Sequence, residues 1–222
     1  MLLAIDTSTR TVGLALYNGV QVLNESVWTS NDYHTVELAP AISEMLERSA
    51  IGVSDLTCLT VALGPGSFTG LRIGLAVAKG LALVCHLPIV GIPTLDVLAA
   101  AQGPLDIPMA ATLRAGRGRL AVGWYQYREN GWEPSSDIEV LTAPELSRKI
   151  HAPTLVCGEF SEEERRLLAR KRRNVRLASP ASCLRRPGFL AELGWQRWQQ
   201  GEVADPATLA PTYLHYNEPI PG

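Results

Sequence analysis

One stretch in the first half of the chain constrains the fold more than any other. It opens with Val61–Leu63, a short apolar run that is typical of a buried strand. The Gly-Pro-Gly at 64–66 must end that strand, because proline has no N–H for a ladder and glycine tolerates a tight turn. Ser67 or Thr69 can then cap a helix that runs to about Cys85. The stretch therefore predicts a buried strand, a turn and a long helix in direct succession.

The predicted helix carries only two charged side chains, Arg72 and Lys79, and is otherwise apolar or small. An ordinary surface helix has a wide polar face, so this one should be covered on both sides. It is too short and too charged for a bilayer, which needs about 20 apolar residues. Gly70, Gly74 and Ala78 recur every four residues and would let another backbone approach closely. We expect one face of the helix on the chain's own sheet and the other on a second helix or a second protein.

The loop before this helix could also bind an anion, because the free N–H groups and the dipole at a helix N-terminus favour negative charge. The P-loop pattern, however, ends in Gly-Lys-Ser/Thr, whereas here Gly70 is followed by Leu71 and Arg72. The spacing by itself favours a plain strand-to-helix turn over a nucleotide motif.

The rest of the chain reads as two repeats of one order of elements. In the first half we predict strands at 2–7, 12–17, 20–28, 57–63 and 88–92, and helices at 35–48, 68–85 and 94–101. After a break at 102–104 we predict strands at 108–113, 119–127, 137–140, 154–157 and 174–177, with helices after Thr142, after Ser161 and at 187–200. Two successive βββαβαβα halves predict a duplicated α/β architecture with domains at 1–101 and 102–222.

The composition allows a sizeable hydrophobic core and gives few other constraints on function. With 222 residues, 46% of them hydrophobic, and a net charge of -2, the chain has no global charge that points to nucleic acid. Its first residues lack the basic segment of a signal peptide, so we expect a cytoplasmic protein. The four cysteines lie far apart and form no Cys-x-x-Cys, which argues against a zinc or redox site.

Two segments carry a resemblance to a known family. Residues 64–74, Gly-Pro-Gly-Ser-Phe-Thr-Gly-Leu-Arg-Ile-Gly, and residues 3–8, Leu-Ala-Ile-Asp-Thr-Ser, resemble the TsaB family, also called YeaZ. Its members are partner subunits of the bacterial machinery that makes threonylcarbamoyladenosine beside the tRNA anticodon. The resemblance implies an actin-like, sugar-kinase-like fold of the ASKHA and RNase H-like type. It is stronger before residue 101 than after, where Arg-Ala-Gly-Arg-Gly-Arg-Leu-Ala at 114–121 replaces the family's Asp-Ala-Arg and Gly-Glu-Val-Tyr.

This resemblance implies an interaction protein with no catalytic residues of its own. It would bind and activate the TsaD transferase through the helices at 35–48 and 68–85, with the TsaE ATPase in the same complex. Alone, the chain would form a homodimer; it would contact tRNA only indirectly and no membrane. No cofactor is expected on this chain alone, although ATP or ADP could lie at the interface of the complex. The predicted partner-binding residues are Leu38, Ile42, Met45, Phe68, Gly70, Leu71, Arg72, Gly74 and Ala78.

A phosphotransferase of the sugar-kinase type is the second hypothesis. In that fold an aspartate at the end of the first strand faces metal or phosphate, and Asp6 has this place, with the Ser8 and Thr9 hydroxyls as further candidate phosphate ligands. Sugar kinases carry a glycine two residues after the aspartate, where this chain has Ser8. The alternative is an Asx or Ser/Thr turn that caps the strand.

No metal site is predicted from the sequence. The four histidines are scattered, and the two metal-binding histidines of TsaD correspond by register to Thr94 and Leu98 here. His34 could be a functional polar residue, although a histidine that merely opens the first helix is the favoured interpretation.

One dense basic cluster follows the acidic residues 162–164. Acids at the start of a helix and bases at its end suit the helix dipole, so a solvated helix is the first interpretation. The alternative is a secondary contact to tRNA phosphates within a complex. No aromatic residues are interleaved to stack bases, which argues against independent sequence-specific RNA binding. The cluster consists of Arg165, Arg166, Arg170, Lys171, Arg172, Arg173 and Arg176.

Overall fold

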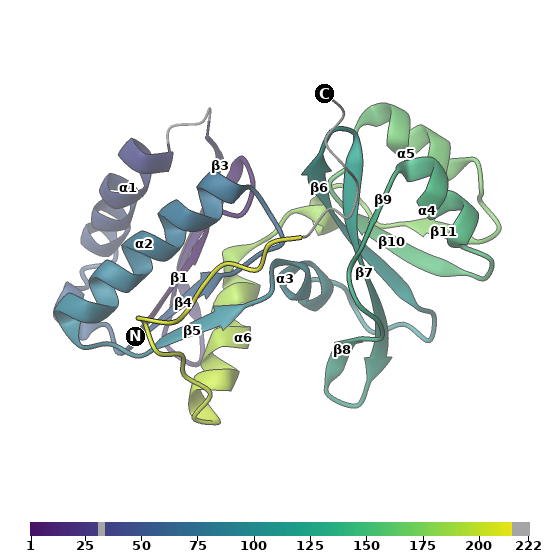
Figure 1. The fold of residues 1–222 in the computed structure, drawn as a ribbon. Helices are drawn as coiled ribbons and strands as arrows, with labels where there is room; N and C mark the ends of the chain where they lie inside the picture. Colours follow the sequence, from purple (N-terminus) through teal and green to yellow (C-terminus); the bar gives the residue numbers. More distant parts are fainter. Residues whose placement is uncertain (31–33, 215–222) are drawn as a thin grey trace. The chain divides into compact units, whose positions relative to one another are not determined.

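The chain folds into two compact units (Figure 1). A computed structural model describes residues 1–30 and 34–214. The first unit comprises Met1–Val97 and Arg185–Thr212, and the second includes Leu98–Leu184. The predicted assignment of 102–222 to a second domain is therefore wrong for its last part. The reason is that the last helix packs on the sheet of the first unit instead of on its own half.

A five-stranded mixed sheet forms the centre of the first unit. Its strand order is β3-β2-β1-β4-β5, with β1, β4 and β5 parallel and β1, β2 and β3 joined as antiparallel neighbours. Asn18-Gly19 turns the chain between β2 and β3, as predicted, and Gly19 has φ 93°. The strands are β1 (Leu2–Asp6), β2 (Thr11–Tyr17), β3 (Val22–Thr29), β4 (Cys58–Ala62) and β5 (Ile89–Ile92).

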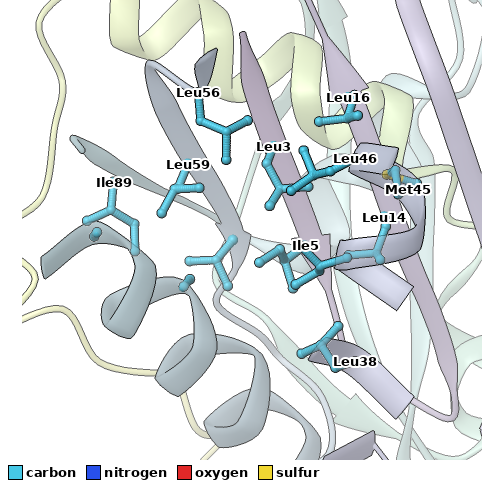
Figure 2. Packing of buried hydrophobic residues seen from close by; sticks show 14 of the residues in the cluster. Leu3, Ile5, Leu14, Leu16, Leu38, Met45, Leu46, Leu56, Leu59 and Ile89 are labelled. Atoms are coloured by element: carbon cyan, nitrogen blue, oxygen red, sulfur yellow. The ribbon is translucent and has the colours of Figure 1, made fainter. Parts of the chain in front are cut away.

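Helices cover both faces of this sheet. Because side chains alternate along a strand, Leu3 and Ile5 of β1 pack on one face against α1 (His34–Arg48) and α2 (Phe68–Cys85), as Figure 2 shows for α1. On the opposite face Leu2 and Ala4 pack against α6 (Pro187–Gln199). A short helix, η1 (Val53–Asp55), precedes β4, and α3 (Thr94–Ala100) follows β5. The predicted βββαβαβα order of the first half is confirmed.

The second unit repeats this topology. Its sheet has the order β11-β10-β6-β7-β8, with β6, β10 and β11 parallel, which is the order of the first sheet read in the other direction. Both predicted capping boxes are present, at Thr142 and Ser161. The elements are β6 (Met109–Gly116), β7 (Arg119–Arg128), β8 (Gly131–Pro134), β9 (Glu139–Leu141), α4 (Ala143–Lys149), β10 (Thr154–Gly158), α5 (Glu162–Ala169), β11 (Val175–Leu177) and η2 (Ala181–Cys183).

The third strand of this unit differs from the prediction. A single strand was expected at 137–140, but both β8 and β9 pair with β7, at different parts of its length. Arg128 pairs with Gly131 across a tight turn, and Gly131 has φ 124°. The Asn130-Gly131 pair carries the same hairpin signal as Asn18-Gly19, and it could have revealed β8.

The four cysteines differ in their access to solvent, which gives a first testable prediction. Cys58 and Cys157 are buried, whereas Cys85 and Cys183 are partly exposed. Burial raises the pKa of the Cys58 thiol to about 12 and also raises the pKa of Cys157. We expect iodoacetamide at mildly alkaline pH to label Cys85 and Cys183 and to spare the other two, because a raised pKa leaves almost no thiolate. Peptide mass spectrometry reports the sites, and rapid labelling of native Cys58 would contradict its burial.

Candidate functional site

The start of α2 is fixed by Ser67, one of the two residues that the sequence offered as a cap. Ser67 has extended backbone angles, and its hydroxyl oxygen accepts a hydrogen bond from the Gly70 N–H at 3.3 Å. Its own N–H donates to the Ser8 carbonyl at 2.6 Å. This bond ties the turn before α2 to the end of β1, so the N–H of Ser67 is not free for an anion.

The small-residue stripe of α2 lies against the turn that follows β1. A Cβ atom placed on Gly74 would lie 2.1 Å from Thr7 Oγ1, and one placed on Gly70 would lie 2.2 Å from the Thr7 carbonyl oxygen. Thr7 Oγ1 in turn donates to the Gly70 carbonyl at 2.7 Å. The predicted close approach of a backbone is confirmed at Gly70 and Gly74, where the chain's own β1 turn lies, and Ala78 packs in the core cluster that also contains α1. This part of the stripe is therefore covered by the chain itself and not by a partner protein.

Most of the predicted partner-binding residues are therefore core residues. Seven of the nine residues are buried in the first unit, which corrects their prediction as direct contacts: Leu38, Ile42, Met45, Gly70, Leu71, Gly74 and Ala78. The helix-wide hydrophobicity misled the sequence interpretation, because a stripe that packs on a sheet and one that packs on a partner look alike. Phe68 and Arg72 are exposed, with Arg72 Cζ 3.7 Å from the centre of the Phe68 ring.

A second stripe runs along the solvent side of α2, and we call it the outer face. Phe68, Arg72, Ala76, Gly80 and Val84 are all exposed and follow one another at four-residue spacing, offset by two from the buried stripe. Leu83 lies beside them; Phe68, Leu83 and Val84 are 54%, 64% and 80% exposed. Sequence reasoning missed Ala76, Gly80, Leu83 and Val84. The charged Arg72 was the sequence signal that could have identified the outer face as solvent-exposed.

By length and composition alone α2 could cross a membrane, with a mean hydropathy of 1.6. A core helix of a soluble protein meets the same criteria. The contacts of the buried stripe with β1 are those of a core helix.

Asp6, Ser8 and Thr9 come together at the end of β1 around a buried ion pair. Arg185 Nε lies 2.9 Å from Asp6 Oδ2, and the two side chains are 1% and 2% exposed. The Ser8 N–H donates to Asp6 Oδ1 at 2.8 Å, and the Ser8 hydroxyl donates to the same oxygen. Arg185 Nη2 also donates to Thr9 Oγ1 at 2.6 Å. Both carboxylate oxygens of Asp6 are thus already engaged, and the Asx turn that the sequence offered as an alternative is present.

Arg185 could not be assigned to this site from the sequence. It lies 179 residues after Asp6, just before α6, and belongs to no motif. A metal ion at Asp6 would have to displace a guanidinium that also donates to the Thr11 carbonyl at 3.1 Å. Arg185 thus neutralises the Asp6 carboxylate and holds the turn after β1 in place.

The remaining candidate polar residues have structural contacts. His34 is buried at the start of α1, where its Nε2 lies 3.1 Å from the Thr9 carbonyl oxygen. Thr94 Oγ1 accepts a hydrogen bond from the Gly64 N–H at 3.0 Å, and Leu98 is buried. Within 1–30 and 34–214 no three His, Cys, Asp or Glu side chains form a group that could hold a metal ion. His215 lies outside the described residues.

The repeated topology of the two units defines the chain as an actin-like α/β protein. YeaZ from Pseudomonas aeruginosa has the same fold, with a TM-score of 0.79 and 25% identity over 96% of this chain and 99% of that one. The ethanolamine utilization protein EutJ from Carboxydothermus hydrogenoformans shares the fold at a TM-score of 0.51 and 16% identity, covering 86% of this chain and 87% of that one. The predicted fold class is confirmed.

Sequence comparison then identifies the family. The family model TsaD, described as tRNA N6-adenosine threonylcarbamoyltransferase, matches residues 22–139. The tRNA threonylcarbamoyladenosine biosynthesis protein TsaB of Bacillus subtilis is 31% identical over 221 residues, which cover 98% of this chain and 95% of that protein. TsaB of Escherichia coli is 34% identical over 147 residues, covering 65% of this chain and 63% of that protein. The chain belongs to the TsaB family, within the wider group that the TsaD model describes.

Proposed function

We propose that this chain is a non-catalytic partner subunit that binds and activates a TsaD transferase during threonylcarbamoylation of tRNA. Its relatives are named for this biosynthesis, and the transferase family model matches it over 22–139. Two proteins built on one fold can pair through equivalent surfaces, as the two copies in a symmetric dimer do. The outer face of α2 is the observation that carries the proposal.

The outer face has the chemistry of a helix-packing surface. Fully burying a large apolar side chain contributes about 1.5–3 kcal/mol, so Phe68, Leu83 and Val84 together offer a substantial gain to a partner that covers them. Ala76 and Gly80 lie between the large residues and leave room for a second helix at an interaxial distance of about 8 Å. We propose that TsaD covers this face in the complex, and that a second copy of the chain covers it when TsaD is absent.

The other components follow from the same proposal. The TsaE ATPase joins the complex, ATP or ADP lies at its interface, and the chain alone binds no cofactor. Contact with tRNA is made within the complex, in the cytoplasm and away from any membrane.

A phosphotransferase of the sugar-kinase type is the competing function. It would need MgATP to bind the isolated chain near Asp6, whose carboxylate is buried and paired with Arg185. That pair argues against this function. The phosphotransferase function would be supported if the isolated chain bound MgATP tightly and transferred phosphate to a sugar, and if Asp6→Ala abolished this transfer.

The test introduces two negative charges on the outer face. In the Leu83→Glu/Val84→Glu variant two carboxylates would have to be desolvated at the interface, which costs several kcal/mol. We expect the wild-type chain to form a homodimer that gives way to a mixed complex when the TsaD of its own genome is added, with or without ATP. The variant should be monomeric and should leave TsaD free. Size-exclusion chromatography with light scattering measures both.

A matched control uses two exposed valines elsewhere on the first unit. Val20→Glu/Val203→Glu adds the same charge at two sites that are also exposed, at 83% and 52%, and lie off α2. This control should dimerise and bind TsaD as the wild type does. If the Leu83/Val84 variant, with an unchanged circular dichroism spectrum, still bound TsaD, the outer face would not be the interface.

A further inference from the structure

The basic cluster of the second unit divides into residues that the fold uses and residues that it leaves open. Arg165 Nη2 donates to the Ala178 carbonyl at 2.6 Å, and Arg166 pairs with Glu162. Lys171 Nζ donates to the carbonyls of Ser147 and Ile150 at 2.5 and 2.6 Å. The other four cations, which we call the arginine patch, are exposed: Arg170, Arg172, Arg173 and Arg176. None of these four side chains has an ion pair or hydrogen bond within the described part of the chain.

The patch sits on a turn that is fixed to the neighbouring helix. Lys171 ties this turn to the last carbonyls of α4, and Asn174 Nδ2 donates to the His151 carbonyl at 2.8 Å. Within the turn, the Asn174 and Val175 N–H groups both donate to the Lys171 carbonyl, at 3.0 and 2.9 Å. The arginines are therefore presented by an ordered platform, which lowers the entropy lost when a ligand binds them.

Helix stability accounts for only part of this charge. Cations near a helix C-terminus offset the dipole, and Arg166 in the last turn of α5 and Lys171 at the end of α4 already do so. Arg176 lies on β11, an edge strand, where a charge discourages unwanted pairing. Neither explanation covers Arg172 and Arg173, which lie beyond the end of α5. Among the residues that the structure describes, neither side chain has an ion pair that would offset their mutual repulsion.

The surroundings of the patch favour one class of polyanion. No exposed large apolar side chain lies between Glu162 and Leu177, so this segment offers nothing to insert into a lipid interface. The same segment has no exposed aromatic ring on which an unpaired base could stack. Guanidinium groups bind phosphate oxygens in a bidentate manner and need no base contact. These features fit the phosphate backbone of a structured RNA.

We infer that the arginine patch binds the phosphate backbone of tRNA directly. The inference rests on the proposed function for the identity of the RNA, and it adds to it a contact made by this chain. Binding of this kind is independent of sequence and falls steeply with salt, because each neutralised phosphate releases a counterion. The patch supplies positioning to the complex and leaves recognition of the target adenosine to the transferase.

The test removes two of the four charges. Arg172→Gln/Arg173→Gln should weaken binding of a fluorescently labelled tRNA transcript roughly tenfold, measured by anisotropy for the chain alone and in its complex with TsaD. Between about 50 and 200 mM salt, the slope of log K against log salt should become shallower by about two. The control Arg117→Gln/Arg128→Gln removes the same charge from two other exposed arginines of the second unit and should change neither quantity.

Each outcome decides a separate point. Equal weakening by both variants, or none by the patch variant, would overturn the inference and leave the proposed function intact, provided the patch variant still binds TsaD. Loss of binding to phosphatidylserine vesicles without any loss of tRNA binding would assign the patch to a membrane surface and equally overturn it. A wild-type chain that ignores TsaD would refute the proposed function, while its affinity for tRNA would still test the patch.

Discussion

An Arg185→Met variant is expected to lose about 3–5 kcal/mol of unfolding free energy, because it leaves the Asp6 carboxylate buried without its partner. Methionine fills a similar volume, so the loss reports the charge more than a cavity. The whole stability of a domain is typically about 5–15 kcal/mol, and a loss of this size should be obvious in urea unfolding followed by circular dichroism. The double variant Asp6→Asn/Arg185→Met removes both charges and should recover part of the loss.

The neighbouring arginine supplies the control. Arg186 pairs with Glu25, with Nε 2.9 Å from Oε2, but its side chain is 57% exposed. Exposed pairs contribute about 0–1 kcal/mol, so Arg186→Met should change stability by no more than that. Glu25 also accepts from the Gly188 N–H at 2.8 Å and keeps a partner in the variant. Equal losses in the two variants would mean that burial does not set the importance of the Asp6 pair.

The fold could be predicted from the sequence wherever one segment carries its own signal. Short apolar runs and turn signals located the strands of the first sheet, and the Ser67, Thr142 and Ser161 caps located three helix starts. The assignment of α6 failed because nothing in its local pattern says which sheet will cover its apolar side. That choice depends on packing between residues almost a whole chain length apart, such as Leu190 and Leu2, which belong to one core cluster.

The candidate site could likewise be predicted where a local pattern marks it, and the prediction failed where the site depends on contacts between distant segments. The sequence marked the β1 turn and α2 as the important elements, and Asp6, Ser8 and Thr9 do lie together. The sequence interpretation chose the wrong stripe of α2 as the interface, because both stripes are mostly small or apolar, although Arg72 marks the outer one. It could not supply Arg185, since an ion pair between distant segments leaves no local pattern. The four open arginines were visible only as part of a cluster of seven, before the structure separated those with internal partners.

A Gly74→Ala variant should be the second large change, because the added methyl group would meet Thr7 at less than contact distance. The ideal Cβ position lies 2.1 Å from Thr7 Oγ1 and 3.2 and 3.3 Å from its Cβ and Cγ2, so the Thr7 side chain would have to move. Moving Thr7 also breaks its hydrogen bond to the Gly70 carbonyl. Overpacking typically costs about 1–3 kcal/mol and a lost hydrogen bond about 1 kcal/mol more. The variant should unfold at clearly lower urea concentration.

Gly80 on the outer face of the same helix makes the comparison sharp. A Cβ atom there meets nothing within 4 Å, so Gly80→Ala should stabilise the protein by roughly 0.5–1 kcal/mol through helix propensity alone. The two variants add the same methyl group six residues apart on one helix, and stability should move in opposite directions. If Gly74→Ala were neutral instead, the close approach of α2 to the β1 turn would not be what requires glycine at this position. If Gly80→Ala left the monomer stable but weakened binding to TsaD, TsaD would contact the outer face directly at Gly80, where there is no side chain.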